Sequence, residues 1–205
     1  MFKRNRQIYL ILLFAVLCVS FLIPGTACSQ RNRESWQPPG KIMDAVGVKP
    51  GMIIGEAGAG TGYFTFPLAE RVGEKGKIYA NDISRSSLDK LKSRAERERV
   101  RNIETVVGKL RDPSFPVKDL DMIIMVYVLH HLDEPVDFVK NLKKYLKPGA
   151  RLVIIERDAE KDRSGSHDFM SKTQALETMK KTGFELDRTE DFLKYDTIYI
   201  YKIRK

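Results

Sequence analysis

The sequence predicts an α/β domain in which helices cover both faces of a doubly wound, mostly parallel sheet. From Gly51 onward, short apolar runs alternate with helical patterns, and this alternation is typical of parallel strands joined by crossover helices. The runs MIIMV and LVII are apolar throughout, as expected of strands buried on both faces. The last two strand patterns have no helix between them, which predicts an antiparallel hairpin at the sheet edge. We therefore expect seven strands.

The order of elements follows from these patterns. Parallel strands are expected at residues 52–57, 77–82, 103–107, 122–126 and 151–156. Helices are expected between them at residues 63–72, 88–99 and 136–146. Pro67 falls inside the first of these helices, so it either occupies the first turn or kinks the helix. Pro148 and Gly149 should end the third helix before the fifth strand begins.

The C-terminal part carries its own boundary signals. Ser171 and Gln174 form a capping-box pattern, which predicts a helix at residues 172–182. The two strands of the hairpin are expected at residues 184–187 and 197–203, joined by a polar turn. No helix long enough to cross between these strands fits in the connection, so they should pair with each other.

Size and composition bound the class of protein. The chain has 205 residues, with 42% hydrophobic and 31% charged residues. This suits one globular domain with a short extension and excludes disordered, collagen-like and disulfide-dense proteins. The formal net charge is +9. A basic stretch at residues 92–101 has helical spacing and is interrupted by Glu96 and Glu98, so we interpret it as a solvated helix face and expect no nucleic-acid partner.

The N-terminus has the pattern of an export signal. Three basic residues in the first seven precede an apolar run at residues 8–23, which is short for a spanning helix of about 20 residues. Ala27 and Cys28 resemble a bacterial lipoprotein processing site, although simple secretion and an uncleaved anchor stay open. We expect a signal or anchor at residues 1–27, a tether at 28–40 and the domain at 41–205. The predicted location is the cell envelope, with the membrane as a partner through the signal or a lipid.

Cysteine and histidine usage limits the chemistry of the domain. Both cysteines, Cys18 and Cys28, lie in the leader. The domain therefore has no intramolecular disulfide, thiol catalyst or thiolate zinc site. Its three histidines, His130, His131 and His167, are too few and too poorly spaced to indicate a metal site.

A glycine-rich motif and an acid indicate a nucleoside cofactor. The motif EAGAGTG follows the first strand and opens the first long helix, so Gly58, Gly60 and Gly62 let the backbone approach a ligand while free amide groups face it. Asp82 ends the second strand about 20 residues later, the spacing at which a carboxylate accepts hydrogen bonds from ribose hydroxyls.

Three details favour S-adenosylmethionine over a dinucleotide. The glycine spacing is G-x-G-x-G, whereas dinucleotide sites favour G-x-G-x-x-G. The C-terminal hairpin does not suit a dehydrogenase. Glu56 would repel a phosphate but attract an ammonium or sulfonium group, and S-adenosylmethionine carries both. A dehydrogenase remains a lesser alternative.

With these features the chain resembles the class I S-adenosylmethionine-dependent methyltransferases over roughly residues 35–205. The resemblance rests on EAGAGTG, IYANDIS, DMIIMVYVLHHL, LKPGARLVIIE and GFEL with the hairpin that follows. It implies a Rossmann-like fold and a small-molecule acceptor, and it is greatest for methyltransferases similar to those of quinones and arsenite. The lack of cysteines in the domain argues against an arsenic-thiolate mechanism.

The resemblance also implies roles for individual residues. Glu56 and the amides of Gly58, Gly60 and Gly62 would hold the methionine moiety, Asp82 the ribose and Ile83 one face of the adenine. Gly108 would line the adenine side of the site. The family often has an acid where this chain has Lys109, which puts the contact to the adenine amino group in doubt; Asp112 is the nearest substitute.

The reacting atoms should lie beyond the fourth strand. Methyl transfer needs alignment and exclusion of water, and it needs a base only if the acceptor loses a proton. His130 and His131 are the candidate catalytic residues, because imidazole titrates near neutrality. The alternative is that they only orient the loop. Glu156 could also reach the pocket, or be a solvated charge. Because S-adenosylmethionine is made in the cytoplasm, an exported protein that keeps the fold without turnover is the rival function.

Overall fold

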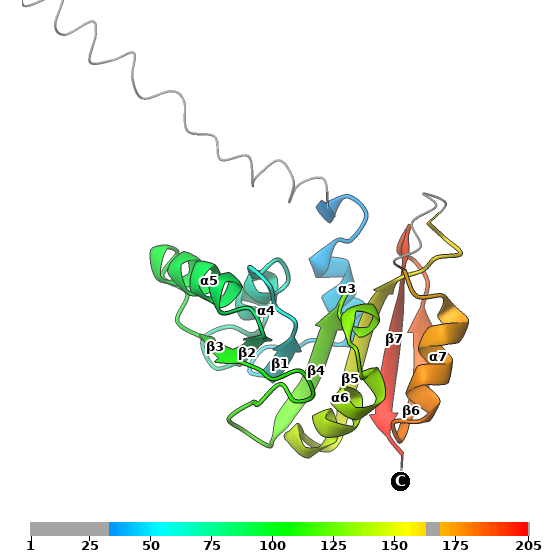
Figure 1. Cartoon of the computed structure of the whole chain (residues 1–205). Coiled ribbons are helices and arrows are strands. Elements are labelled where there is room, and N and C mark those ends of the chain that lie inside the picture. The colour runs from blue at the N-terminus through cyan, green and yellow to red at the C-terminus, as the bar shows by residue number, and fades with distance from the viewer. Residues whose placement is uncertain (1–32, 163–168, 205) are drawn as a thin grey trace, which may run out of the picture. The chain divides into compact units, whose positions relative to one another are not determined.

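The computed structural model describes residues 33–162 and 169–204, and residues 36–205 form one compact unit (Figure 1). The leader at residues 1–27 and the candidate His167 lie outside the described residues. Within the described residues, no helix is long and apolar enough to cross a membrane.

The domain is built on one seven-stranded sheet, as predicted. Its strands lie in the order β3-β2-β1-β4-β5-β7-β6. The first five strands are parallel, and β7 runs antiparallel to both β5 and β6. The strands are β1 Ile53–Ala57, β2 Lys77–Asp82, β3 Ile103–Val107, β4 Leu120–Val126, β5 Leu146–Arg157, β6 Phe184–Glu190 and β7 Asp196–Ile203.

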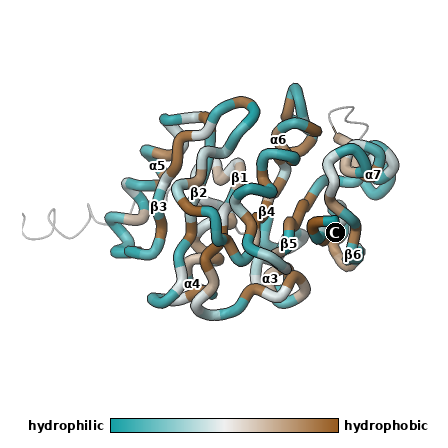
Figure 2. Tube along the Cα trace, turned by 90° about the horizontal axis from the view of Figure 1, so that it is seen from below, coloured by the Kyte–Doolittle hydropathy of each residue, from teal (hydrophilic) through white to brown (hydrophobic). Residues whose placement is uncertain are grey.

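Five helices and two short 3-10 turns lie within the described residues 36–162 and 169–204 of the domain. The helices are α3 Pro39–Val46, α4 Thr65–Val72, α5 Arg85–Arg97, α6 Pro135–Leu142 and α7 Lys172–Lys180. The 3-10 turns are η1 Leu129–His131 and η2 Lys143–Tyr145. The side chains that α3 and α4 bury pack on one face of the sheet, whereas those of α6 and α7 pack on the other. In Figure 2, α5 alternates between hydrophilic and hydrophobic residues, and Leu91 and Ala95 are among those it buries.

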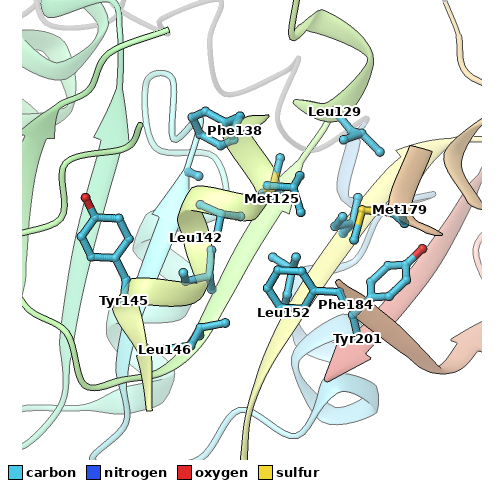
Figure 3. Close-up of a cluster of buried hydrophobic side chains, with 14 of the residues drawn as sticks. Met125, Leu129, Phe138, Leu142, Tyr145, Leu146, Leu152, Met179, Phe184 and Tyr201 are labelled. Atoms are coloured by element: carbon cyan, nitrogen blue, oxygen red, sulfur yellow. The ribbon is translucent and has the colours of Figure 1, made fainter. Parts of the chain in front are cut away.

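Two apolar layers explain the uninterrupted apolar runs of the central strands. Successive side chains of a strand point to opposite faces, so each of these strands must be apolar at every position. Ile124 and Val153 pack in the layer under α3 and α4, whereas Met125 and Leu152 pack in the layer under α6 and α7. Figure 3 shows this second layer, with Met125 and Leu152 beside side chains from α6 and α7.

Several local predictions are confirmed and three are corrected. Pro67 occupies the first turn of α4, and the capping box of α7 is formed. Helix α6 ends at Leu142, four residues earlier than expected, and a 3-10 turn follows it. Pro148 and Gly149 lie within β5, because Leu146 already pairs with Leu120 before a register shift. The strand β6 extends to Glu190, which makes the hairpin longer than predicted.

A buried carboxylate joins three distant segments of the domain. Asp196, at the start of β7, accepts hydrogen bonds from Gln37 Nε2 at 2.7 Å and from the Tyr127 hydroxyl at 2.6 Å. Gln37 is fully buried, and its carbonyl accepts a hydrogen bond from Tyr63. Part of the predicted tether is therefore packed into the domain, starting at Trp36. Burial, with Asp196 nearby, raises the pKa of Tyr127 well above its usual range, so the hydroxyl stays a neutral donor.

We expect Asp196→Ala to lower the free energy of unfolding by about 2–4 kcal/mol, because two buried donors lose their acceptor at about 1–3 kcal/mol each. Urea denaturation measures this change. Asp187→Ala serves as the control, because Asp187 is exposed and pairs with Arg188 at the surface, and it should change stability by less than about 1 kcal/mol. Equal effects of the two substitutions would contradict the structural role of Asp196.

Candidate functional site

A cleft of about 370 Å³ lies at the carboxyl ends of β1, β2 and β4, where parallel sheets of this topology bind ligands. Its size falls within the range of small-molecule sites. The side chains come from the loops that follow four strands. The residues that line it are Gly58, Asn81, Asp82, Ile83, Lys109, Leu110, Arg111, Tyr127, Val128, His131, Leu132, Asp133, Glu134 and Phe138.

Asp82 is held in one orientation at the edge of this cleft. Its Oδ2 accepts a hydrogen bond from the Gly60 amide at 2.8 Å, and its Oδ1 accepts one from the Ser84 amide at 2.8 Å. Each carboxylate oxygen has two lone pairs, so one acceptor position remains on each. Two adjacent hydroxyls of a ribose are donors that match this pair of acceptors.

The structure corrects the predicted role of the loop amides. The amide of Gly58 donates to the carbonyl of Asn81 at 2.8 Å, and that of Gly62 donates to the carbonyl of Ala59 at 2.9 Å. With Gly60 bonded to Asp82, all three glycine amides are used within the protein. They do not form the cradle of free donors that a phosphate or carboxylate would need. This arrangement disfavours a dinucleotide, whose pyrophosphate depends on such donors.

Two of the three glycines are required by packing. Gly58 has φ +79°, and a Cβ there would lie 2.3 Å from Cγ2 of Val128, in the loop after β4. At Gly62, with φ +94°, a Cβ would lie 2.7 Å from the ring of Phe66. The absence of a side chain thus lets the loop pack closely against β4 and α4. Only at Gly60 does the added Cβ meet no atom within 4 Å.

Glu56 and Gly108 lie near the cleft without lining it. Glu56 is buried, and its Oε2 accepts a hydrogen bond from the Thr65 hydroxyl at 2.5 Å, which ties β1 to the start of α4. Gly108 donates to the carbonyl of Asp82, and a Cβ there would lie 2.4 Å from the Asn81 amide. The contacts of both residues with a cofactor remain predictions.

The adenine side of the cleft is apolar and exposed. Ile83 and Leu110 are 60% and 69% exposed, although both are large hydrophobic residues. Burying this apolar surface under a ligand would be favourable, and the contact of Ile83 with adenine remains a prediction. Lys109 lines the cleft in place of the family's acid. Asp112, the proposed substitute, does not line the cleft, and its carboxylate accepts hydrogen bonds from Lys144 and Tyr145.

The structure separates the two candidate histidines. Both lie on the 3-10 turn η1, with ring centroids 4.0 Å apart. His131 lines the cofactor cleft, whereas His130 lines a second groove beside α7. The turn follows Tyr127, whose φ of +60° is rare for a residue with a side chain. This backbone conformation redirects the chain at the end of β4.

Glu156 fixes this turn from the neighbouring strand. Its Oε1 accepts hydrogen bonds from the amides of Val128 at 3.1 Å and Leu129 at 2.6 Å, and its Oε2 lies 2.5 Å from His130 Nδ1. The residue is 1% exposed, which excludes the solvated charge that the sequence left open. No sequence signal identified this contact, because Glu156 lies in β5 and its partners follow β4, more than 25 residues earlier in the chain.

Comparisons with known proteins agree with this geometry. Residues 54–149 match a protein family described as a methyltransferase domain. A demethylmenaquinone methyltransferase from Lactococcus lactis is 31% identical over 128 residues, which are 62% of this chain and 50% of that protein. A ubiquinone/menaquinone biosynthesis C-methyltransferase from Shewanella piezotolerans is 28% identical, over 75% of this chain and 61% of the relative. The chain thus spans about half to three fifths of these relatives' lengths.

A solved structure supports the same assignment. A SAM-dependent methyltransferase from Aquifex aeolicus matches with a TM-score of 0.77 and 26% identity, over 82% of this chain and 91% of that chain. Its description names the cofactor that the cleft at Asp82 fits. Over residues 54–149 this chain is therefore similar to a methyltransferase domain, and its described fold is similar to that of a SAM-dependent methyltransferase.

Proposed function

We propose that this domain transfers the methyl group of S-adenosylmethionine to a small-molecule acceptor. The observation that carries the proposal is the carboxylate of Asp82, fixed by two backbone amides with one acceptor position left on each oxygen. The bonded glycine amides support a cofactor without a phosphate at the loop. The relatives named as quinone methyltransferases support a small acceptor.

The residues of the cleft have separate tasks in this function. S-adenosylmethionine supplies an electrophilic methyl group on its sulfonium. Asp82 accepts hydrogen bonds from the ribose, while Ile83 and Leu110 cover the adenine and exclude water from it. Val128 and His131 line the part of the cleft nearest the loop after β4. Because transfer of this kind depends on alignment, the rigid loop held by Glu156 orients the groups around the reacting centre.

The rival function is an envelope protein that keeps the fold without turnover. An open apolar cleft beside a fixed Asp82 favours retained cofactor binding, since a protein with no ligand gains nothing from exposing Ile83 and Leu110. Transfer of a radiolabelled methyl group to small molecules of a cell extract separates the two functions. Cofactor binding without any labelled product would favour the rival.

We expect Asp82→Ala to weaken binding of S-adenosylmethionine more than tenfold, because the two ribose hydrogen bonds to a carboxylate are lost and each contributes about 1.5–3 kcal/mol. Titration calorimetry on the purified chain measures the affinity. The control is Asp89→Ala, on the exposed surface of α5, which should leave the affinity unchanged. If the two variants bind equally and both are folded by circular dichroism, the ribose assignment is wrong.

We expect Gly60→Val to reduce S-adenosylmethionine binding at least tenfold while secondary structure is kept. The φ of +55° is unfavourable for a β-branched residue, and the strain would disturb the amide that holds Asp82. Gly51→Val is the matched control, because Gly51 also has a positive φ and open space around its Cβ but precedes β1 at the opposite end of the strand. Equal losses of affinity in both variants would show a general effect of strain.

We also propose, from the sequence alone, that the leader exports the domain and that Cys28 receives a lipid. Two acyl chains anchor a protein firmly, whereas one chain binds only marginally. Cys28→Ser should therefore move the protein from the membrane fraction to a soluble or unprocessed form, and labelling with a radioactive fatty acid should disappear. Cys18→Ser, within the apolar run, should change neither result. A cytoplasmic protein that is unaffected by Cys28→Ser would refute the export of the domain.

A further inference from the structure

A groove beside α7 lies next to the cofactor cleft. It has a volume of about 440 Å³, and its lining residues are His130, Phe169, Met170, Gln174, Glu177, Thr178 and Lys181. The last four of these occur at helical spacing, so they form one polar face of α7 that runs along the groove. Phe169 and Met170 supply an apolar wall on the chain that leads into this helix.

The imidazole of His130, which lines the groove, is held by a buried carboxylate. Its side chain is 9% exposed, and Nδ1 lies 2.5 Å from Oε2 of Glu156, whose side chain is 2% exposed. A carboxylate only accepts hydrogen bonds, so Nδ1 carries the proton of the neutral ring. The other ring nitrogen, Nε2, is then an acceptor with a free lone pair. This is the form of histidine that can remove a proton from a ligand.

The groove and the cleft meet at the paired histidine rings. His130 lines the groove and His131 lines the cleft, and their ring centroids are 4.0 Å apart. Both rings lie on the 3-10 turn η1, which follows β4. The two sites are therefore adjacent without sharing a residue.

We propose that this groove binds the methyl acceptor, that the acceptor is a hydroxylated aromatic compound, and that His130 is its catalytic base. The inference rests on the proposed methyltransferase function. The ring of Phe169 lies edge-on to His130 at 6.4 Å, and Met170 adds a polarisable surface, so the apolar wall suits an aromatic ring. The polar face of α7 suits oxygen substituents at the rim. Glu156 is a positioning residue, because it acts through His130.

The step balances with these groups alone. The proton of the acceptor hydroxyl moves to His130 Nε2, and its electron pair stays on the acceptor oxygen or is shared with the ring carbon beside it. That atom forms a bond to the methyl carbon while the carbon–sulfur bond breaks, and the electron pair of that bond stays on sulfur. S-adenosylhomocysteine leaves as a neutral thioether, and the imidazolium is stabilised by the carboxylate of Glu156.

The first test uses 2-naphthol and its methyl ether, 2-methoxynaphthalene, as probes of the full chain saturated with S-adenosylhomocysteine. We expect 2-naphthol to bind at least tenfold more tightly, because only its hydroxyl can donate to Nε2. Thr178→Arg should fill the groove and abolish the binding of both probes. Thr173→Arg is the matched control on the same helix, because Thr173 is exposed outside the groove. Equal binding of the two probes, or equal affinity in the two variants, overturns the proposal.

The second test separates a positioning role of Glu156 from a structural one. In Glu156→Gln the amide oxygen can still accept from the loop, but its NH₂ group faces Nδ1, so the proton of His130 should move to Nε2. Nitrogen-15 NMR of the imidazole should show this change of tautomer, and the preference for 2-naphthol should fall at least tenfold. His130→Asn should lose the same preference. An unchanged tautomer, or an unchanged preference in either variant, overturns the proposal.

Affinity for S-adenosylhomocysteine distinguishes failure of this inference from failure of the proposed function. Thr178→Arg and Thr173→Arg should keep that affinity within about threefold, since neither threonine lines the cofactor cleft. If the wild-type chain binds S-adenosylhomocysteine but shows no preference for 2-naphthol, only the groove assignment is wrong. If the wild-type chain does not bind S-adenosylhomocysteine, the proposed function fails as well.

Discussion

The hydrogen bonds of Glu156 organise the catalytic edge of the sheet. Its carboxylate ends β5 and accepts from two amides of the loop after β4, as well as facing His130. Burying a charge is costly unless it is hydrogen-bonded, and these partners offset that cost. Because they fix the turn η1, the same contacts determine that His131 lies on the cofactor cleft and His130 on the groove beside α7. The placement of the two histidines on different pockets thus depends on one side chain.

Further buried acids lie near the carboxyl ends of the strands, and each joins different segments of the chain through hydrogen bonds. Glu56 ties β1 to α4, and Asp196 joins the N-terminal segment to Tyr127 and β7. Each acid lies at or beside a chain reversal, where backbone amides and hydroxyls would otherwise lack partners. The loops around the site are consequently rigid before any ligand binds. Such preorganisation suits a reaction that depends on alignment more than on a strong catalyst.

The glycine-rich loop shows how one motif can serve packing and binding together. Gly58 and Gly62 permit close contacts with Val128 and Phe66, so they would be needed even without a ligand. The loop satisfies its own amides and leaves the carboxylate of Asp82 as the polar group aimed at the cleft. A loop of this kind selects a sugar through its hydroxyls and provides no cradle for phosphate. The motif therefore suits a nucleoside cofactor that has no phosphate at the loop.

The sequence by itself determined the alternation of strands and helices that builds the sheet, the C-terminal hairpin and the acid at Asp82. These features depend on local periodicity and on spacing along the chain. The tertiary structure alone decided what the side chains do. Adjacent residues such as His130 and His131 carry the same local signal, and only Glu156, 26 positions away, separates their directions. Gln37 reads as part of a tether, yet Asp196, 159 positions away, buries it. Contacts between distant segments form only when the whole sheet assembles, so no local pattern contains them.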